Sequence, residues 1–223
     1  MTDISDLQAG ELHYKIPDYG KPKSTEEFWA GDFGTQYIER NRFDWQKRVP
    51  FWTSIVARIE AKYETPSIME FGCNIGSNLM ALRTVRPALT LRGVDVNMAA
   101  VDQAHNLGFD VYGNEVTLGS IKTYHNSNEA FDLCFTAGVL IHVPPQDIID
   151  AMTRIKDFSR RYVLVIEYFA EQEEEVIYRG YEGKLWKRPY GKLYQDMGLK
   201  LIETGFVGKE DGFDNCAWWL LER

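Results

Sequence analysis

Residues 67–79 read Ser67-Ile68-Met69-Glu70-Phe71-Gly72-Cys73-Asn74-Ile75-Gly76-Ser77-Asn78-Leu79, and this stretch decides the fold. It predicts a buried strand that ends in a glycine-bearing turn and leads directly into a helix. Such a unit points free backbone N–H groups at a ligand above the carboxyl end of the strand, and glycine removes the Cβ that would block close approach. The stretch therefore predicts a nucleotide-like cofactor site in a doubly wound sheet.

The spacing of the glycines argues against a dinucleotide cofactor. The G-x-G-x-x-G fingerprint would need glycine at positions 72, 74 and 77, and only Gly72 fits. The arrangement Glu70-x-Gly72-x-x-x-Gly76 instead resembles the first motif of the class I S-adenosylmethionine-dependent methyltransferases, in which the acid and the glycine turn lie beside the methionine part of the cofactor. Asn74 stands where most members carry glycine, and asparagine tolerates a left-handed backbone.

A second acidic residue follows the next predicted strand. Residues 89–97 alternate toward a β-branched strand that ends at Asp95. A doubly wound sheet places a carboxylate for the ribose hydroxyls about 20 residues after the glycine turn. Two alternatives stay open, because Asp95 could cap the helix that follows Asn97, and the glycine motif could be a strand and turn without a ligand. The two motifs together favour a cofactor site.

Composition indicates one α/β domain. With 223 residues, 44% of them hydrophobic, the chain suits a single large core with a small appendage. The net charge of -8 argues against binding to nucleic acid or to an anionic membrane, so a small-molecule substrate is favoured. Cys73, Cys134 and Cys216 lack C-x-x-C spacing, and we expect neither disulfides nor a metal site. Without an apolar run of roughly 18 residues or a signal-peptide core, the chain is expected to be cytoplasmic.

The order of predicted elements gives the fold class. Residues 1–23 are expected to form a loosely ordered arm and residues 24–64 a helical lid, rich in aromatics and interrupted by glycines. Residues 65–223 alternate strands and helices, with the third strand at 109–112 and a cap insertion at about 171–197. They end in a predicted antiparallel hairpin. We predict an α/β, Rossmann-like, doubly wound and mostly parallel seven-stranded sheet with this hairpin and the lid, the layout of the methyltransferase superfamily.

Longer motifs narrow the resemblance. The lid carries Phe28-Trp29-Ala30-Gly31-Asp32-Phe33-Gly34-x-x-Tyr37-Ile38-x-Arg40-Asn41, and later blocks read Gly138-Val139-Leu140-Ile141-His142-Val143, Glu167-Tyr168, Tyr178-Arg179-Gly180 and Leu185-Trp186-Lys187-Arg188. From about residue 25 to the C-terminus, the chain resembles the pseudaminic acid biosynthesis-associated methylases. This resemblance implies a methyl transfer often encoded beside genes for nonulosonic sugars. The acceptor stays open, because that family is named for its gene neighbourhood.

The cofactor-binding candidates lie mostly at the carboxyl ends of the predicted strands. Ser120 and Ile121 occupy the place where related methyltransferases contact the adenine, and Arg40 is expected to pair with the cofactor's carboxylate unless it caps a neighbouring helix. The residues expected to hold S-adenosylmethionine are Glu70, Gly72, Cys73, Asn74, Gly76, Asn78, Asp95, Val96, Ser120, Ile121, Ala137, Tyr37 and Arg40.

Three residues are candidates for catalysis. His142 follows the fourth predicted strand, where a general base would reach the acceptor. Glu167 and Tyr168 leave the fifth predicted strand at the same edge, where a carboxylate would take a proton or bind a sugar hydroxyl. The alternatives are a packed histidine that bonds a backbone carbonyl and a strand-end cap.

The lid and the cap supply the substrate-binding candidates. Aromatic faces attract cations, and planar cations pair with carboxylate or phosphate. The candidates are Trp29, Phe33, Tyr178, Arg179, Lys187 and Arg188. The alternative is a packed lid and a solvated basic loop. The leading prediction is a methyltransferase, monomer or homodimer, acting on an oxygen or nitrogen of a sugar acid or nucleotide sugar. A protein or RNA methyltransferase and a non-catalytic cofactor-binding protein remain alternatives.

Overall fold

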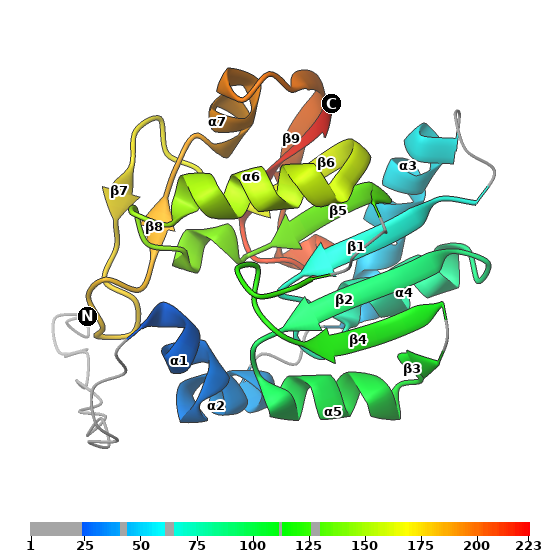
Figure 1. Cartoon of the computed structure of the whole chain (residues 1–223), viewed down its shortest axis with the longest axis horizontal. Helices are drawn as coiled ribbons and strands as arrows, with labels where there is room; N and C mark the ends of the chain where they lie inside the picture. The colour runs from blue at the N-terminus through cyan, green and yellow to red at the C-terminus, as the bar shows by residue number, and fades with distance from the viewer. Residues whose placement is uncertain (1–23, 41–43, 61–64, 112, 126–129) are drawn as a thin grey trace, which may run out of the picture.

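The computed structural model describes residues 24–40, 44–60, 65–111, 113–125 and 130–223 (Figure 1). The predicted arm at residues 1–23 lies outside the described residues, as do parts of the predicted lid at residues 41–43 and 61–64.

One sheet of eight strands forms the centre, in the order β3-β4-β2-β1-β5-β6-β10-β9 (Figure 1). Its strands are β1 (Ser67–Phe71), β2 (Thr90–Asp95), β3 (Asp110–Val111), β4 (Asn114–Leu118), β5 (Phe131–Ala137), β6 (Ser159–Glu167), β9 (Lys200–Val207) and β10 (Cys216–Glu222). β4, β2, β1, β5 and β6 run parallel, whereas β10 pairs antiparallel with both β6 and β9. The Rossmann-like fold and the terminal antiparallel pair are therefore confirmed.

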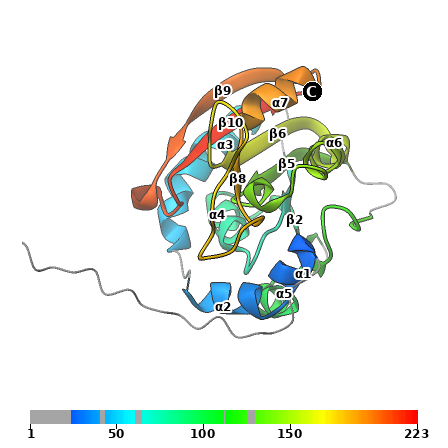
Figure 2. The ribbon, with the colours of Figure 1, turned by 90° about the vertical axis from the view of Figure 1, so that its left-hand side faces the viewer.

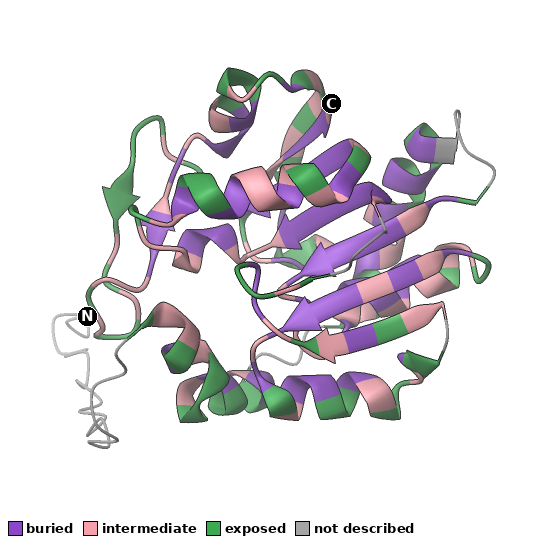
Figure 3. Cartoon of the chain, viewed as in Figure 1, coloured by how far each residue is buried: buried purple, intermediate pink, exposed green. Residues whose placement is uncertain are grey.

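Helices cover both faces of this sheet. One face packs against α3 (Val49–Glu60), α4 (Ser77–Val85) and α5 (Met98–Asn106), and the other against α6 (Ile148–Phe158) and α7 (Tyr190–Asp196). Burial follows from this layering, because the central strands are covered on both sides and contain mostly apolar residues (Figure 3). On α3, Ile55 and Ile59 lie about one turn apart and are fully buried.

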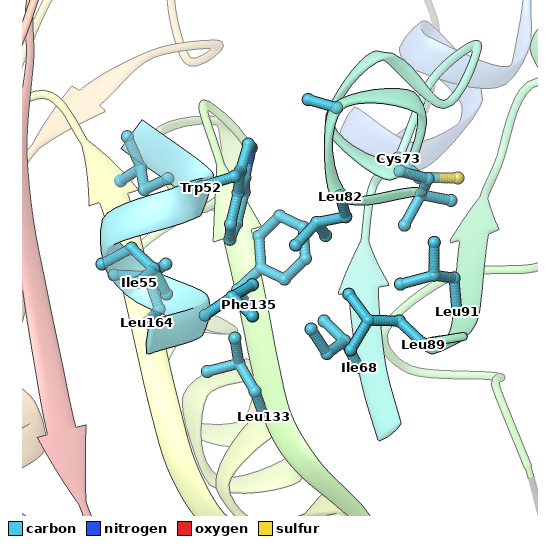
Figure 4. Packing of buried hydrophobic residues seen from close by; sticks show 14 of the residues in the cluster. Trp52, Ile55, Ile68, Cys73, Leu82, Leu89, Leu91, Leu133, Phe135 and Leu164 are labelled. Carbon is cyan, nitrogen blue, oxygen red and sulfur yellow. The ribbon is translucent and has the colours of Figure 1, made fainter. Parts of the chain in front are cut away.

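Trp52 of α3 and Phe135 of β5 anchor the core beneath the carboxyl edge of the sheet (Figure 4). Both are fully buried, their ring centroids are 4.6 Å apart, and aliphatic residues such as Leu164 pack in the same cluster. Trp52 also donates its indole N–H to Oδ1 of Asn78 in α4 at 3.2 Å. The core therefore fixes the position of the helix that follows the glycine turn.

The sheet contains one strand more than predicted. The predicted third strand at residues 109–112 is only the two-residue β3, which pairs antiparallel with β4. The parallel neighbour of β2 is β4, where only Val116 is buried. β4 borders β3 near the edge of the sheet, and its polar residues gave no alternating hydrophobic pattern.

The lid and the cap lie at the carboxyl ends of the parallel strands (Figures 1 and 2). The segment predicted as the lid contains α1 (Thr25–Ala30), α2 (Asp32–Arg40) and the short helix η1 (Trp45–Arg48). Its last helix, α3, packs on the sheet as part of the core, and the name lid is kept for the first three. Ser24 caps α1 by accepting from the N–H of Glu27. The cap contains a two-stranded sheet of β7 (Glu174–Glu175) and β8 (Trp186–Lys187).

Candidate active site

A cavity of about 490 Å³ opens at the carboxyl edge of the sheet, between the strand ends, the lid and the cap. Ten of the predicted site residues line it: Gly72, Asn74, Asp95, Val96, Ser120, Ile121, Ala137, Tyr37, Trp29 and His142. Tyr168 and Tyr178 line a smaller adjoining cavity. The other predicted residues line neither cavity, namely Glu70, Cys73, Gly76, Asn78, Arg40, Phe33, Glu167, Arg179, Lys187 and Arg188.

The glycine turn forms the floor of the larger cavity. Gly72, Asn74 and Gly76 have φ angles of 73°, 50° and 81°, the left-handed region that favours glycine or asparagine. A Cβ on Gly72 would lie 2.5 Å from a methyl carbon of Val139, so a side chain there would force the two loops apart. Asn74 thus adopts the left-handed backbone that we expected asparagine to tolerate at this position.

Asp95 joins the ends of β1 and β2. Its Oδ2 accepts from the backbone N–H of Asn74 at 2.7 Å, and its Oδ1 accepts from the N–H of Asn97 at 2.9 Å. Burial raises the pKa of Asp95, and the backbone N–H groups of Asn97, Asn74 and Val96 oppose that rise. The carboxylate is thus held rigidly at the cavity wall, 9% exposed.

Glu70 lies beneath the turn and outside the cavity. Its Oε1 accepts from the side-chain amide of Asn78 at 2.6 Å, whereas its Oε2 is buried without a hydrogen-bond partner among the described residues. Burial raises the pKa of Glu70 to about 8, although Asn78 and Arg48 oppose this. Arg48 in turn donates to Oδ1 of Asn78 at 2.8 Å. Glu70 therefore supports the first turn of α4 from below.

His142 faces the cavity from the short helix η2 (Leu140–His142) after β5. Its Nδ1 lies 2.6 Å from the carbonyl oxygen of Lys184, and a carbonyl only accepts, so Nδ1 carries the proton. Burial lowers the pKa of His142 to about 4, and the bond to Lys184 opposes this. The ring is therefore neutral at pH 7, with the lone pair on Nε2. Trp29 and Tyr178 flank it, with ring centroids 4.5 Å and 5.1 Å away.

Glu167 supports the turn that carries His142. The carboxylate is fully buried and accepts from the backbone N–H groups of Val139, Leu140 and Ile141 at 3.1, 3.0 and 3.3 Å. Burial raises the pKa of Glu167 to about 7, and these N–H groups oppose the rise. These contacts match the strand-end cap that the sequence left as an alternative.

The predicted cations of the lid and the cap line neither cavity. Arg40 is exposed, bonds Gln36 and lies over the ring of Phe33 at 5.0 Å. Arg179 is exposed and has a left-handed backbone with φ of 50°. Arg188 is 1% exposed, pairs with Glu173 at 2.6 Å and donates to the carbonyl of Leu140 at 3.1 Å. Arg188 therefore fastens the cap to η2.

The cavity-lining residues that sequence reasoning missed include Asn97, Lys184, Arg48 and Asp214. The side chain of Asn97 caps α5 and also donates to the carbonyl of Trp29 at 3.0 Å, which joins the lid to the sheet. A Cβ on Gly34 would lie only 1.8 Å from that carbonyl oxygen, so the contact requires glycine there. The sequence placed Asn97 after a predicted strand and gave no sign of its contact with the lid.

The described part of the chain contains neither a membrane-spanning helix nor a cluster of metal ligands. No helix there is long and apolar enough to cross a membrane. The same residues contain no group of three or more histidine, cysteine or acidic side chains that could hold a metal ion.

Comparisons with known proteins place the chain among proteins of known fold. Residues 68–161 match a protein family described as "Methyltransferase domain". No curated protein sequence matches the chain significantly. The solved magnesium protoporphyrin IX methyltransferase from Synechocystis PCC 6803, with bound S-adenosylmethionine, is 18% identical with a TM-score of 0.64, over 89% of this chain and 94% of that chain.

A second solved structure shares the fold at still lower identity. The 1,6-didemethyltoxoflavin-N1-methyltransferase from Burkholderia thailandensis, which holds its acceptor and S-adenosylhomocysteine, is 10% identical with a TM-score of 0.66, over 85% of each chain. The family match covers the glycine turn, Asp95 and His142, the residues on which the cavity is built. Residues 68–161 thus resemble a methyltransferase domain, and the described chain shares its fold with these two solved structures.

Proposed function

We propose that this enzyme binds S-adenosylmethionine in the larger cavity and methylates an oxygen or nitrogen of a small polar metabolite. The observation that carries the proposal is Asp95, whose carboxylate is fixed at the cavity wall by Asn74 and Asn97. A carboxylate so placed accepts from both hydroxyls of a ribose. Gly72 supports the same assignment, because any Cβ there would collide with Val139 and displace the wall of the cavity.

Other residues of the cavity would hold the remaining parts of the cofactor. Ser120 and Ile121 follow β4 and line the wall beyond Asp95, where they would contact the adenine. Tyr37 and Trp29 of the lid also line the cavity. When bound, S-adenosylmethionine supplies an electrophilic methyl group on its sulfonium, so the protein's task is to orient the acceptor, exclude water and take a proton.

His142 is the candidate general base. Its neutral ring keeps the Nε2 lone pair available at pH 7, and no described residue bonds that atom. Nε2 would accept the proton that an acceptor hydroxyl loses as it is methylated, or the proton lost by the ammonium that forms when a neutral amine is methylated. Trp29 and Tyr178 would exclude water around the reacting atoms. Glu167 fits a positioning role, because it holds the backbone of residues 139–141 instead of facing the cavity.

The acceptor that we propose is a sugar acid or nucleotide-linked sugar. Its support is the resemblance to the pseudaminic acid biosynthesis-associated methylases together with the cations of the lid and the cap. Lys184 lines the cavity, and Arg179 and Arg40 are exposed on the cap and the lid. Arg179 adopts a strained backbone for a residue other than glycine, a feature that often marks a functional position.

The proposed function is tested by incubating the purified enzyme with isotope-labelled S-adenosylmethionine and a panel of sugar acids and nucleotide sugars. Mass spectrometry should detect a product heavier by one labelled methyl group, together with S-adenosylhomocysteine. The variant His142→Ala provides the control, because it should bind the cofactor and form little product. Tight binding of S-adenosylhomocysteine with no product from any acidic sugar would contradict the proposed acceptor class.

A further inference from the structure

Arg188 follows the short strand β8 of the cap, and its side chain is almost completely buried. The sequence made it a candidate for binding an anion of the substrate, but it lines neither cavity. Its Nε pairs with Glu173, and its Nη1 donates to the carbonyl of Leu140 at 3.1 Å and to the hydroxyl of Tyr190 at 3.3 Å. Burial of a guanidinium is costly unless it is paired and hydrogen-bonded. The partners of Arg188 thus belong to the protein itself, and one of them lies in the turn after β5.

Leu140 in that turn is held by opposite charges on its two sides. Its backbone N–H donates to the carboxylate of Glu167 at 3.0 Å, and its carbonyl accepts from Arg188. Glu167 ends β6 and Arg188 belongs to the cap, so the sheet and the cap hold the same residue. Hydrogen bonds to charged groups are roughly twice as strong as neutral ones. Leu140 is the first residue of η2 and His142 the last, so this clamp acts two residues from the ring.

The cap also holds the ring of His142 directly. The Nδ1–H of the ring donates to the carbonyl of Lys184 at 2.6 Å. Residues 184–188 therefore contact η2 twice, once at the carbonyl of Leu140 and once at the ring. Because both contacts come from one short segment, a cap that loses the bond from Arg188 would also lose the alignment of the Lys184 carbonyl with Nδ1.

We propose that Arg188 is a positioning residue, which acts through Leu140 and the cap to orient the ring of His142 and to keep water away from it. This inference rests on the proposed function, which makes His142 the general base. Arg188 makes no hydrogen bond or ion pair with the titratable groups that share the smaller cavity with the ring, namely Tyr37, Arg48, Tyr168, Tyr178, Asp214 and Cys216.

The protonation of His142 reports this role without a methyl acceptor. Burial lowers the pKa of His142 to about 4, and the bond to Lys184 opposes this. If removal of Arg188 lets water reach the ring, the desolvation is relieved and the pKa of His142 should rise toward the ordinary value of about 6.5.

The test follows the histidine ring signals of the full chain, labelled with nitrogen-15, by NMR from pH 7.5 to pH 5.5. The wild-type ring of His142 should stay neutral throughout, with its signal assigned by its loss in His142→Ala. Arg188→Met, which keeps the apolar stem and removes the charge, should bring the midpoint of His142 into this range. His105, whose ring also bonds a backbone carbonyl, is the internal reference and should titrate identically in both proteins.

Two further variants separate positioning from folding. Glu173→Gln leaves Arg188 in place and removes its ion-pair partner, so it should shift the midpoint of His142 the same way by less. It gives the result if Arg188→Met does not fold. The matched control is Glu174→Gln, which removes the same charge from the next, exposed position and should leave the midpoint unchanged. Arg188→Lys, which keeps the charge, should restore part of the wild-type behaviour.

The affinity for S-adenosylhomocysteine, measured by calorimetry, should stay within twofold of the wild type in each variant, because the cofactor wall is untouched. A His142 midpoint that does not move in Arg188→Met or Glu173→Gln would overturn the positioning role. A shift accompanied by a large loss of S-adenosylhomocysteine affinity would also overturn it, because Arg188 would then support the whole edge of the sheet. A wild type that keeps a neutral His142 but does not bind S-adenosylhomocysteine would instead refute the proposed function.

Discussion

The cofactor wall and the catalytic wall of the larger cavity are built in different ways. On the cofactor wall, residues 72–76 and Asp95 follow adjacent parallel strands, and backbone N–H groups close to the turn hold the carboxylate. On the catalytic wall, His142 is held by Lys184 and its turn by Glu167, through contacts 42 and 26 to 28 residues apart in sequence. The first wall depends on a local motif and the second on the register of the sheet and the fold of the cap.

If the two walls have separate tasks, then changes to each should affect different measurements. The largest expected effect is that of His142→Ala. Loss of a general base lowers kcat by about 10²- to 10⁴-fold, and the cofactor wall remains intact. The dissociation constant of S-adenosylhomocysteine, measured by calorimetry, should stay within twofold. Full turnover in this variant would reassign His142 to packing.

The cofactor wall should show the reverse pattern. Asp95→Ala removes charged hydrogen bonds and should weaken S-adenosylhomocysteine by about 1–3 kcal/mol, or roughly 5- to 150-fold. The matched control is Asp102→Ala, an exposed aspartate on α5 that lines neither cavity. If the Asp95 and Asp102 variants bound S-adenosylhomocysteine with equal affinity, Asp95 would not bind the ribose.

The pH dependence of kcat/KM examines the catalytic wall alone. Because burial lowers the pKa of His142 to about 4, the basic form should persist as the pH falls from 7 to 5.5. An unperturbed histidine, with a pKa near 6.5, would be only about one-tenth neutral at pH 5.5. The rate at pH 5.5 should therefore be about tenfold higher than an exposed histidine would allow. An acid limb centred near 6.5 would show that His142 is hydrated during catalysis.

The lowered pKa of His142 also makes the stability of the fold depend on pH. Unfolded His142 takes up a proton below about pH 6.5, whereas the folded form stays neutral until about pH 4. The contribution of His142 to stability is therefore present above pH 6.5 and is lost as the pH falls toward 4. Urea unfolding of the wild type and His142→Ala at pH 7 and pH 5 should show this as a loss between these pH values in the wild type that is smaller in the variant.

The smallest effect is expected where the lid meets the cofactor wall. Asn97 caps α5 and donates to the carbonyl of Trp29. Asn97→Ser keeps a good cap and loses the amide donor, whereas Asn97→Ala loses both. Both variants should release S-adenosylhomocysteine a few-fold faster in stopped-flow fluorescence, and only Asn97→Ala should also lose about 1 kcal/mol of stability. Unchanged release from both variants would mean that the contact does not hold the lid.

The cofactor wall was easier to predict from the sequence than the edge of the sheet. The glycine turn and Asp95 were predictable because an alternating apolar pattern fixes a strand, and the residue after a parallel strand lies at the carboxyl edge. β4 was missed because it lies near the edge of the sheet and has one buried residue, so its pattern carries no period of two. The cofactor wall therefore depends on two short motifs that the sequence alone reveals.

The support of the catalytic wall was not predictable from spacing. Glu167 reaches the turn after β5 because Ala137 pairs with Ile166, and only this register places it beside residues 138–141. Asp214 lies 46 residues from Tyr168 and joins it only after β10 has paired with β6. Contacts of this kind depend on tertiary structure, which no local pattern encodes.

The most direct test of the central claim is a crystal structure of the enzyme with S-adenosylhomocysteine. The account predicts the two ribose hydroxyls at about 2.5–3.0 Å from the carboxylate of Asp95, and the thioether on the side of the glycine turn nearer His142. A ligand bound elsewhere, or a ribose turned away from Asp95, would contradict it.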